Sequence, residues 1–153
     1  MTYDIPGREP LTIKTIILDL NGTLTVGGVV PEGVKPRLGN LKAAGFKIIL
    51  FTGNARGNAE KVAKELGIEW KLIKNSQDKR SLVLGLETDT CAAIGNGLID
   101  LELMKAVTLR IVTLQAEGAY VQTLINSDIV VPTINDALDL FIDPQRLIAT
   151  LKK

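Results

Sequence analysis

An acid and an amide follow a short apolar run near the start of the chain, in the sequence Ile-Ile-Leu-Asp-Leu-Asn-Gly-Thr over residues 16–23. The run is β-branched and too short for a helix, which predicts a buried parallel strand ending at Asp19. Ligands of open α/β sheets bind outside the carboxyl ends of the strands, so a carboxylate there is available for chemistry. Gly22 lets the backbone turn tightly and approach an anion, and Thr23 offers a hydroxyl. The alternative is a strand followed by an Asx-type turn without function.

Further polar residues follow two other apolar runs. Thr52 ends one of them, and Asn96 and Asp100 follow another, at residues 91–94. Because the carboxyl ends of parallel strands meet at one edge of a sheet, we expect these side chains near Asp19. Carboxylate and amide oxygens are ligands for a hard cation such as Mg²⁺. Each feature alone is also an ordinary strand end or turn.

Two lysines compete for the role of a fixed cation at this edge. Lys79 lies near the start of a predicted helix, and Lys74 lies at the end of a predicted strand. A cation beside a carboxylate nucleophile and a phosphoryl group would offset their mutual repulsion. Lysine is usually a solvated surface residue, so the residue types by themselves leave the choice open.

Composition limits both the chemistry and the partners. The 153 residues include 18 Lys and Arg against 17 Asp and Glu. This predicts one domain over residues 1–153, without the global charge that attracts nucleic acid or an anionic membrane. Histidine is absent and Cys91 is the single cysteine, which excludes Ser-His-Asp catalysis, Cys-His catalysis and an internal disulfide. Apolar runs fall short of the roughly 20 residues that span a bilayer, and the N-terminus lacks a signal-peptide pattern, so we expect a cytoplasmic protein.

Short apolar runs alternate with amphipathic segments along the chain. Strands are predicted at residues 13–18, 47–51, 69–73, 91–94, 108–112 and 128–131. Helices are predicted at residues 34–44, 58–66, 78–87, from residue 98, at 120–125, 134–141 and 144–151. Residues 1–11 are predicted to be a surface lead-in, and residues 24–33 a short hairpin-like flap over the site. The alternation predicts a three-layer Rossmann-like α/β domain with a parallel sheet of about six strands.

Taken together, these segments resemble the haloacid dehalogenase-like superfamily of phosphotransferases. Its first motif, Asp-x-Asp-Gly-Thr, matches residues 19–23 except that Asn21 replaces the second acid. Residues 51–68, from Phe-Thr-Gly-Asn to Leu-Gly-Ile, resemble the matching segment of P-type ATPases, and residues 95–100 resemble their Gly-Asp-Gly-x-Asn-Asp motif with two departures. The resemblance covers residues 12–151 and is strongest to soluble P-type-ATPase-like proteins. The short intervals between the motifs leave no room for a cap domain.

The resemblance implies a role for each candidate residue. Asp19 corresponds to the nucleophile that becomes aspartyl phosphate, and Asn21 stands where the phosphatases have their general acid and base. The resemblance also favours Lys79 over Lys74 as the phosphate lysine. The implied catalytic residues are Asp19, Asn21, Thr52 and Lys79, and the implied phosphate-binding residues are Gly22, Thr23, Thr52, Gly53 and Lys79. The implied Mg²⁺ ligands are Asp19, Asn21, Asn96 and Asp100.

These assignments predict a Mg²⁺-dependent phosphohydrolase or phosphotransferase. Attack by Asp19 needs positioning and electrostatics, which the retained residues supply. Hydrolysis of an aspartyl phosphate gains typically about 10²–10⁴-fold from a general base, which an amide at position 21 cannot be, so we expect slow turnover. The alternative is a degenerate relative that binds phosphate, Mg²⁺ or a protein partner without turnover. The sequence does not identify the phosphorylated substrate, which can be large without a cap, and it leaves homo-oligomerisation open.

Overall fold

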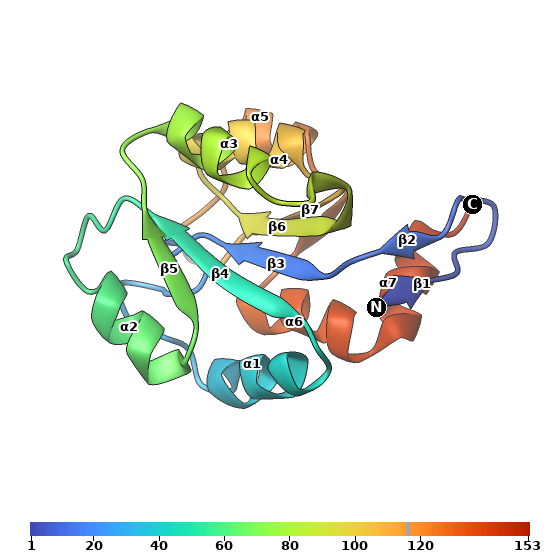
Figure 1. Ribbon diagram of the computed structural model, residues 1–153, viewed down its shortest axis with the longest axis horizontal. Coiled ribbons are helices and arrows are strands. Elements are labelled where there is room, and N and C mark those ends of the chain that lie inside the picture. The colour runs from blue at the N-terminus through green and yellow to red at the C-terminus, as the bar shows by residue number, and fades with distance from the viewer. Residues whose placement is uncertain (116) are drawn as a thin grey trace.

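The computed structural model describes residues 1–115 and 117–153, and its centre is a sheet of six parallel strands between two layers of helices (Figure 1). The strands are β3 (Thr15–Leu18), β4 (Lys47–Thr52), β5 (Glu69–Leu72), β6 (Cys91–Gly95), β7 (Leu109–Thr113) and β8 (Ile129–Val131). Their spatial order is β5-β4-β3-β6-β7-β8. This confirms the predicted three-layer α/β fold and its strand number. The order reverses between β3 and β6, and open parallel sheets bind ligands at such a reversal.

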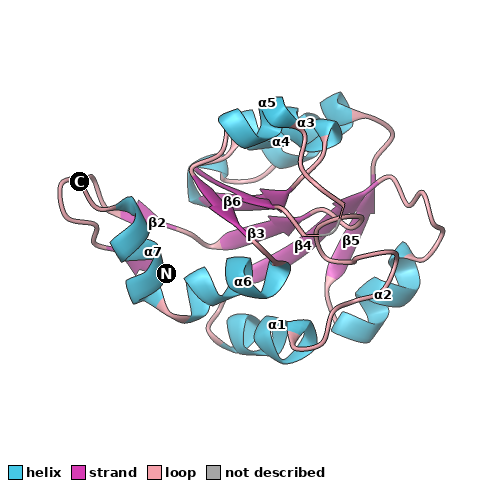
Figure 2. Cartoon of the chain, turned by 180° about the vertical axis from the view of Figure 1, so that it is seen from behind, coloured by secondary structure: helices cyan, strands magenta, loops and turns pink. Residues whose placement is uncertain are grey.

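Two groups of helices cover the two faces of the sheet, as Figures 1 and 2 show from opposite sides. One face carries α1 (Val34–Ala43), α2 (Ala59–Leu66) and α6 (Ile134–Ile142). The other face carries α3 (Ser76–Leu84), α4 (Leu101–Ala106) and α5 (Val121–Ile125). The chain ends with α7 (Pro144–Leu151), and two short 3₁₀ turns, η1 (Thr88–Thr90) and η2 (Leu98–Asp100), flank β6. None of the helices within the described residues has the length and apolarity needed to cross a lipid bilayer.

The central strands are mostly apolar because both of their faces are covered. In β3, Ile16 and Leu18 pack into the core cluster that includes α1 and α6, while Ile17 packs into the cluster that includes α3 and α4. In β4, Leu50 and Phe51 alternate between the same two clusters. Successive side chains of a strand point to opposite faces, so a strand between two helical layers buries most of its residues. This packing holds the carboxyl ends of β3, β4 and β6 rigidly side by side.

The first eleven residues are not the surface lead-in that the sequence predicts. β1 (Thr2–Tyr3) pairs antiparallel with β2 (Leu11–Thr12), and Tyr3 and Ile5 are buried in the core cluster that contains α7. The composition of this segment is polar and includes two prolines, so it gives no local signal for the two-stranded ribbon, which is held in place by the side chains of Tyr3 and Ile5. The stabilising contacts come from the far end of the chain.

Two further boundaries differ from the prediction. Helix α3 begins at Ser76 because the Asn75 side chain caps it, accepting a hydrogen bond from the backbone N–H of Asp78 at 3.0 Å. The helix ends at Leu84, with Gly85 as its C-cap. Helix α1 ends at Ala43, one residue before the predicted end, and the exposed Ala44 is its C-cap. Both differences arise at helix ends, where capping rather than apolar periodicity sets the boundary.

Candidate active site

Asp19 follows β3 directly and lies at the carboxyl edge of the sheet, almost fully buried. Its backbone N–H donates to the carbonyl of Ile94 in β6 at 3.0 Å. One carboxylate oxygen, Oδ1, lies 2.6 Å from Nζ of Lys79, which reaches it from α3. Lys79 Nζ also lies 2.5 Å from Oδ1 of Asp100, and both of these side chains are fully buried. Lys79 is therefore the lysine beside Asp19, and Lys74 is exposed.

Burial and charge together determine how these groups titrate. Burial raises the pKa of Asp19 to about 7, the nearby carboxylate of Asp100 adds to the rise, and the Lys79 ammonium opposes it. Burial alone would lower the pKa of Lys79, but the two carboxylates outweigh it and raise that pKa above its ordinary value. Lys79 therefore remains a cation at neutral pH and neutralises part of the negative charge of its two partners.

Asp100 binds Lys79 and the loop that follows β6. Its Oδ2 accepts hydrogen bonds from the backbone N–H groups of Asn96 at 3.0 Å and Gly97 at 2.9 Å, while its Oδ1 receives Lys79. Gly95 is required here, because a Cβ at that position would lie 2.6 Å from Cγ of Asp100. Both oxygens of Asp100 are therefore engaged within the protein.

The loop after Asp19 folds tightly against Asn96. Gly22 has a φ of +76°, and a Cβ there would collide with the Asn96 side-chain nitrogen. Thr23 Oγ1 donates to Asn96 Oδ1 at 3.2 Å, and both residues are buried. The Asn21 Oδ1 atom is also buried, and it has no hydrogen-bond partner within the described part of the chain. The loop therefore keeps one acceptor free close to Asp19.

Thr52 ends β4 and presents a hydroxyl at the same edge. Its Oγ1 accepts a hydrogen bond from the backbone N–H of Asn54 at 3.1 Å, so the hydroxyl hydrogen can be donated to a bound anion. Asn54 adopts the left-handed conformation, with a φ of 53°, and its Oδ1 accepts from Ala59 N at 2.9 Å, at the start of α2. Side-chain hydrogen bonds of Thr52 and Asn54 therefore fix the turn after β4 and the position of the Thr52 hydroxyl.

A cavity of about 260 Å³ opens at this edge. It is lined by Asp19, Asn21, Thr52, Gly53, Ala55, Asn96, Gly97 and Ile99. Five of these are predicted site residues, whereas the other predicted residues, Gly22, Thr23, Lys79 and Asp100, are not among the lining residues. The sequence analysis missed Ala55, Gly97 and Ile99, whose small or apolar side chains give no chemical signal beyond their nearness to strand ends.

The residues that line the cavity offer several oxygens to a hard divalent cation. Asp19 offers a carboxylate, and Asn21 offers an amide oxygen and a backbone carbonyl. Asn96 Oδ1 already accepts from Thr23, and Asn96 Nδ2 donates to the carbonyl of Gly118 at 2.8 Å. Among the residues that the structure describes, no three Asp, Glu, His or Cys side chains are grouped to hold a metal. The residues fit Mg²⁺, which accepts one or two carboxylates and keeps several other ligands.

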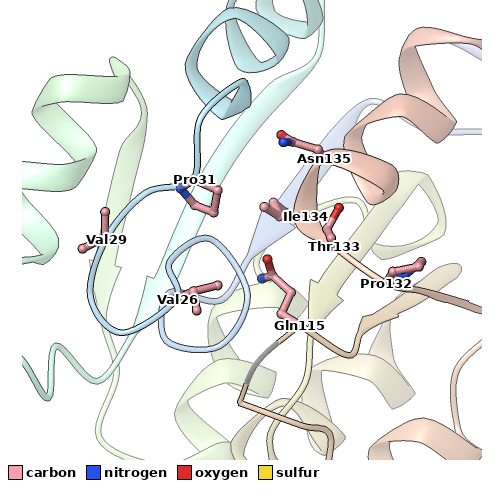
Figure 3. A pocket seen from close by; sticks show the side chains of 8 residues that line it. All are labelled: Val26, Val29, Pro31, Gln115, Pro132, Thr133, Ile134 and Asn135. Atoms are coloured by element: carbon pink, nitrogen blue, oxygen red, sulfur yellow. The ribbon is translucent and has the colours of Figure 1, made fainter.

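A second hollow, of about 670 Å³, lies beside the hairpin that follows this loop (Figure 3). Val26 and Val29 exchange backbone hydrogen bonds of 2.9 and 3.0 Å, which confirms the predicted hairpin, although residues 24–33 are not among those that line the 260 Å³ cavity. The lining residues are Val26, Val29, Pro31, Gln115, Pro132, Thr133, Ile134 and Asn135. The Gln115 amide donates to the carbonyls of Gly22 and Thr23, so this side chain joins the hollow to the loop after Asp19. The hollow is mostly apolar and contains none of the predicted site residues.

The fold is shared with solved structures of haloacid dehalogenase-like phosphatases and hydrolases. The cobalt-bound deoxy-D-mannose-octulosonate 8-phosphate phosphatase of Haemophilus influenzae aligns with a TM-score of 0.74 and 18% identity, over 93% of this chain and 94% of that chain. The corresponding phosphatase of Moraxella catarrhalis, solved with magnesium, phosphate and KDO, aligns with a TM-score of 0.70 and 24% identity, over 92% and 94%. A hydrolase of this superfamily from Legionella pneumophila aligns with a TM-score of 0.69 and 24% identity, over 90% and 86%. At these identities the likeness shows the fold.

Two sequence relatives come from Methanocaldococcus jannaschii. The chain is 42% identical over 92 residues to the uncharacterized protein MJ0073, a match that covers 60% of this chain and 87% of that protein, and the two belong to one family. It is 26% identical over 135 residues to a soluble P-type ATPase-like phosphatase, which covers 85% of this chain but only half of that protein. No protein-family model matches the chain. The comparisons confirm the predicted resemblance to this superfamily, and one of the two sequence relatives is named a phosphatase.

Proposed function

We propose that this chain is a Mg²⁺-dependent phosphohydrolase or phosphotransferase that works through an aspartyl phosphate on Asp19. The observation that carries the proposal is the placement of Asp19 at a cavity, 2.6 Å from the fully buried Lys79, with the Thr52 hydroxyl on the same edge. Homologues named as phosphatases support a phosphate ester as the substrate. The absence of a cap domain, which the sequence predicts, would admit a large ester.

The first step forms a bond from an Asp19 carboxylate oxygen to the phosphorus of a phosphate monoester. The bond to the leaving oxygen breaks, and the leaving group takes its proton from water. Thr52 donates to a phosphoryl oxygen, and Lys79 offsets the repulsion between carboxylate and phosphate. When bound, Mg²⁺ supplies further positive charge, and Asp19 and Asn21 would hold it. In the second step water attacks the phosphorus of the acyl phosphate, which releases phosphate and restores Asp19.

Asn21 limits the second step. Its amide can neither take a proton from the attacking water nor give one to the leaving group, and general acid–base help of that kind contributes typically about 10²–10⁴-fold. Decay of the aspartyl phosphate should therefore limit turnover. The competing proposal, a protein that binds phosphate, Mg²⁺ or a protein partner without turnover, is favoured by the amides at positions 21 and 96.

Hydrolysis of an activated aryl phosphate, measured with and without Mg²⁺, tests the proposed function. The wild-type protein should release one equivalent of phenolate per active site in a burst and then turn over slowly. Asp19→Ala should abolish both phases, and Asn21→Asp should raise the steady rate up to about 10²–10⁴-fold. Asn40→Asp, which makes the same change on the exposed face of α1, serves as the control and should alter neither phase. Activity that survives in Asp19→Ala, or the absence of phenolate release in both wild type and Asn21→Asp, would contradict the proposal.

A further inference from the structure

We propose that the 670 Å³ hollow beside the hairpin is a second binding site, which takes a small uncharged molecule with an apolar body and one hydrogen-bond donor. The molecule would contact Gln115, which lies between the hairpin and the start of α6 (Figure 3) and holds the loop that follows Asp19. Binding there would act on that loop, although the hollow and the proposed phosphoryl cavity share no lining residue.

The side chains around the hollow favour an apolar molecule without charge. None of the eight lining residues is charged, and five are apolar, namely Val26, Val29, Pro31, Pro132 and Ile134. A charged group that enters such surroundings loses hydration without gaining an ion pair, which is costly. The volume also falls within the roughly 300–1,000 Å³ that is typical of sites for small molecules.

The hydrogen-bond acceptor for such a molecule is Oε1 of Gln115. Thr133 Oγ1 donates to Oδ2 of Asp136 at 2.6 Å and accepts from its backbone N–H at 3.2 Å. Asn135 Nδ2 donates to the carbonyl of Glu32 at 2.8 Å, and Asn135 Oδ1 is buried. Gln115 Oε1 accepts no hydrogen bond from the described residues and is not buried, so it can accept one from a ligand.

Gln115 also links the hollow to the loop. Its Nε2 donates to the carbonyl of Gly22 at 3.4 Å and to the carbonyl of Thr23, and its backbone N–H donates to the Pro132 carbonyl at 2.8 Å. Its φ of +29° is unfavourable for a residue with a side chain, so these contacts hold it in place. Asn21, next to Gly22 in the chain, lines the proposed phosphoryl cavity. A donor bound to Oε1 would polarise the amide and strengthen the bonds from Nε2 to the loop.

The size of the hollow favours a small molecule over a protein partner. Eight residues line it, whereas a stable protein interface typically uses about 20–30 residues on each side. A second copy of this chain seated in the hollow would make its spectroscopic signals depend on the protein concentration. Binding of a small molecule predicts no such dependence in the ligand-free protein.

Indole is a suitable probe because it combines an apolar ring system with one N–H donor. Its titration into the wild-type protein is followed in proton–nitrogen correlation spectra. We expect saturable shifts with a dissociation constant on the order of 1 mM for a ligand of this size, at Val26, Val29, Gln115 and residues 133–135. Indole-3-acetate, which carries a carboxylate, should bind at least roughly tenfold more weakly. The absence of saturable shifts at these residues, or equal binding of the two ligands, would overturn the inference.

N-methylindole tests the hydrogen bond, because it has the ring system of indole without the donor. It should bind the wild-type protein roughly 2–10-fold more weakly than indole. In Gln115→Met the acceptor is gone, so the two ligands should bind alike, whereas Gln122→Met, on the exposed surface of α5, should keep the difference. Equal binding of the two ligands to wild type, or a difference that persists in Gln115→Met, would overturn the role of Gln115. The wild-type comparison remains decisive should Gln115→Met fail to fold.

The link to the loop has a separate readout in the side-chain amide signals of Asn21. These should shift with the same dissociation constant as the signals of the hollow, whereas those of Asn40, exposed on α1, should stay unchanged. Unshifted Asn21 signals would overturn the link. Signals of the hollow that change when the ligand-free protein is diluted would indicate a contact between copies of this chain and would overturn the small-molecule site. None of these measurements uses catalysis, so their outcome is independent of the proposed function.

Discussion

Replacing Lys79 by methionine should be among the most damaging single changes in this protein. The ammonium holds Asp19 and Asp100 together at 2.6 and 2.5 Å, and all three side chains are buried. Methionine keeps the length and apolar character of the stem but removes the charge. The carboxylates of Asp19 and Asp100 would then lie buried close to each other without a cation between them.

The size of the loss follows from the burial. Removing one partner of a buried ion pair typically costs about 3–5 kcal/mol, because the charge that remains lacks compensation. Lys79 serves two carboxylates, so we expect a loss near the upper end of that range at neutral pH. Small domains have about 5–15 kcal/mol of total stability, so Lys79→Met should be marginally folded.

Urea unfolding followed by the fluorescence of Trp70, the single tryptophan, measures the loss. Lys74→Met is the matched control, because Lys74 is exposed, and its free energy of unfolding should stay within about 0.5 kcal/mol of wild type. The triple variant Lys79→Met, Asp19→Asn, Asp100→Asn removes all three charges and should recover much of the loss. A loss in Lys79→Met below about 1 kcal/mol, or no recovery in the triple variant, would refute the reasoning.

Two further predictions concern the loop and its acid. Gly22→Ala should lower the free energy of unfolding in urea by at least about 2 kcal/mol, because a φ of +76° disfavours a side chain and the new Cβ would collide with Asn96. Gly27→Ala is the control, with a φ of 58° and open space around the new Cβ, and should lower it by only about 1–2 kcal/mol. Equal losses in the two variants would contradict the collision with Asn96. For pH, the pKa of Asp19 is raised from 3.8 to about 7, so its contribution to stability is fully present below about pH 4 and is lost as the pH rises through about 7. The free energy of unfolding of wild type minus that of Asp19→Asn should therefore fall over this range, and a difference that is flat or rises with pH would contradict the shift.

The arrangement of elements was largely predictable from the sequence, because the signals for strands and helices are local. The apolar run before Asp19 and the run before Thr52 are buried strands, and apolar residues at helical spacing mark α2. The N-terminal ribbon was not predictable, since only the packing of Tyr3 and Ile5 against distant parts of the chain reveals it. The short signals at helix ends were also misread by a few residues.

The sequence by itself determined which residue types arrive at the carboxyl edge of the sheet, because each follows directly on a strand or begins a helix. Only the tertiary structure decided what those residues contact. Lys79 reaches Asp19 across 60 residues of chain and Thr23 reaches Asn96 across 73, and separations of that kind leave no periodic trace. The same packing turns Asp100 away from the cavity and leaves the Asn21 oxygen free. Residue type and position follow from local chemistry, whereas the direction of a side chain follows from how helices and loops pack over the sheet.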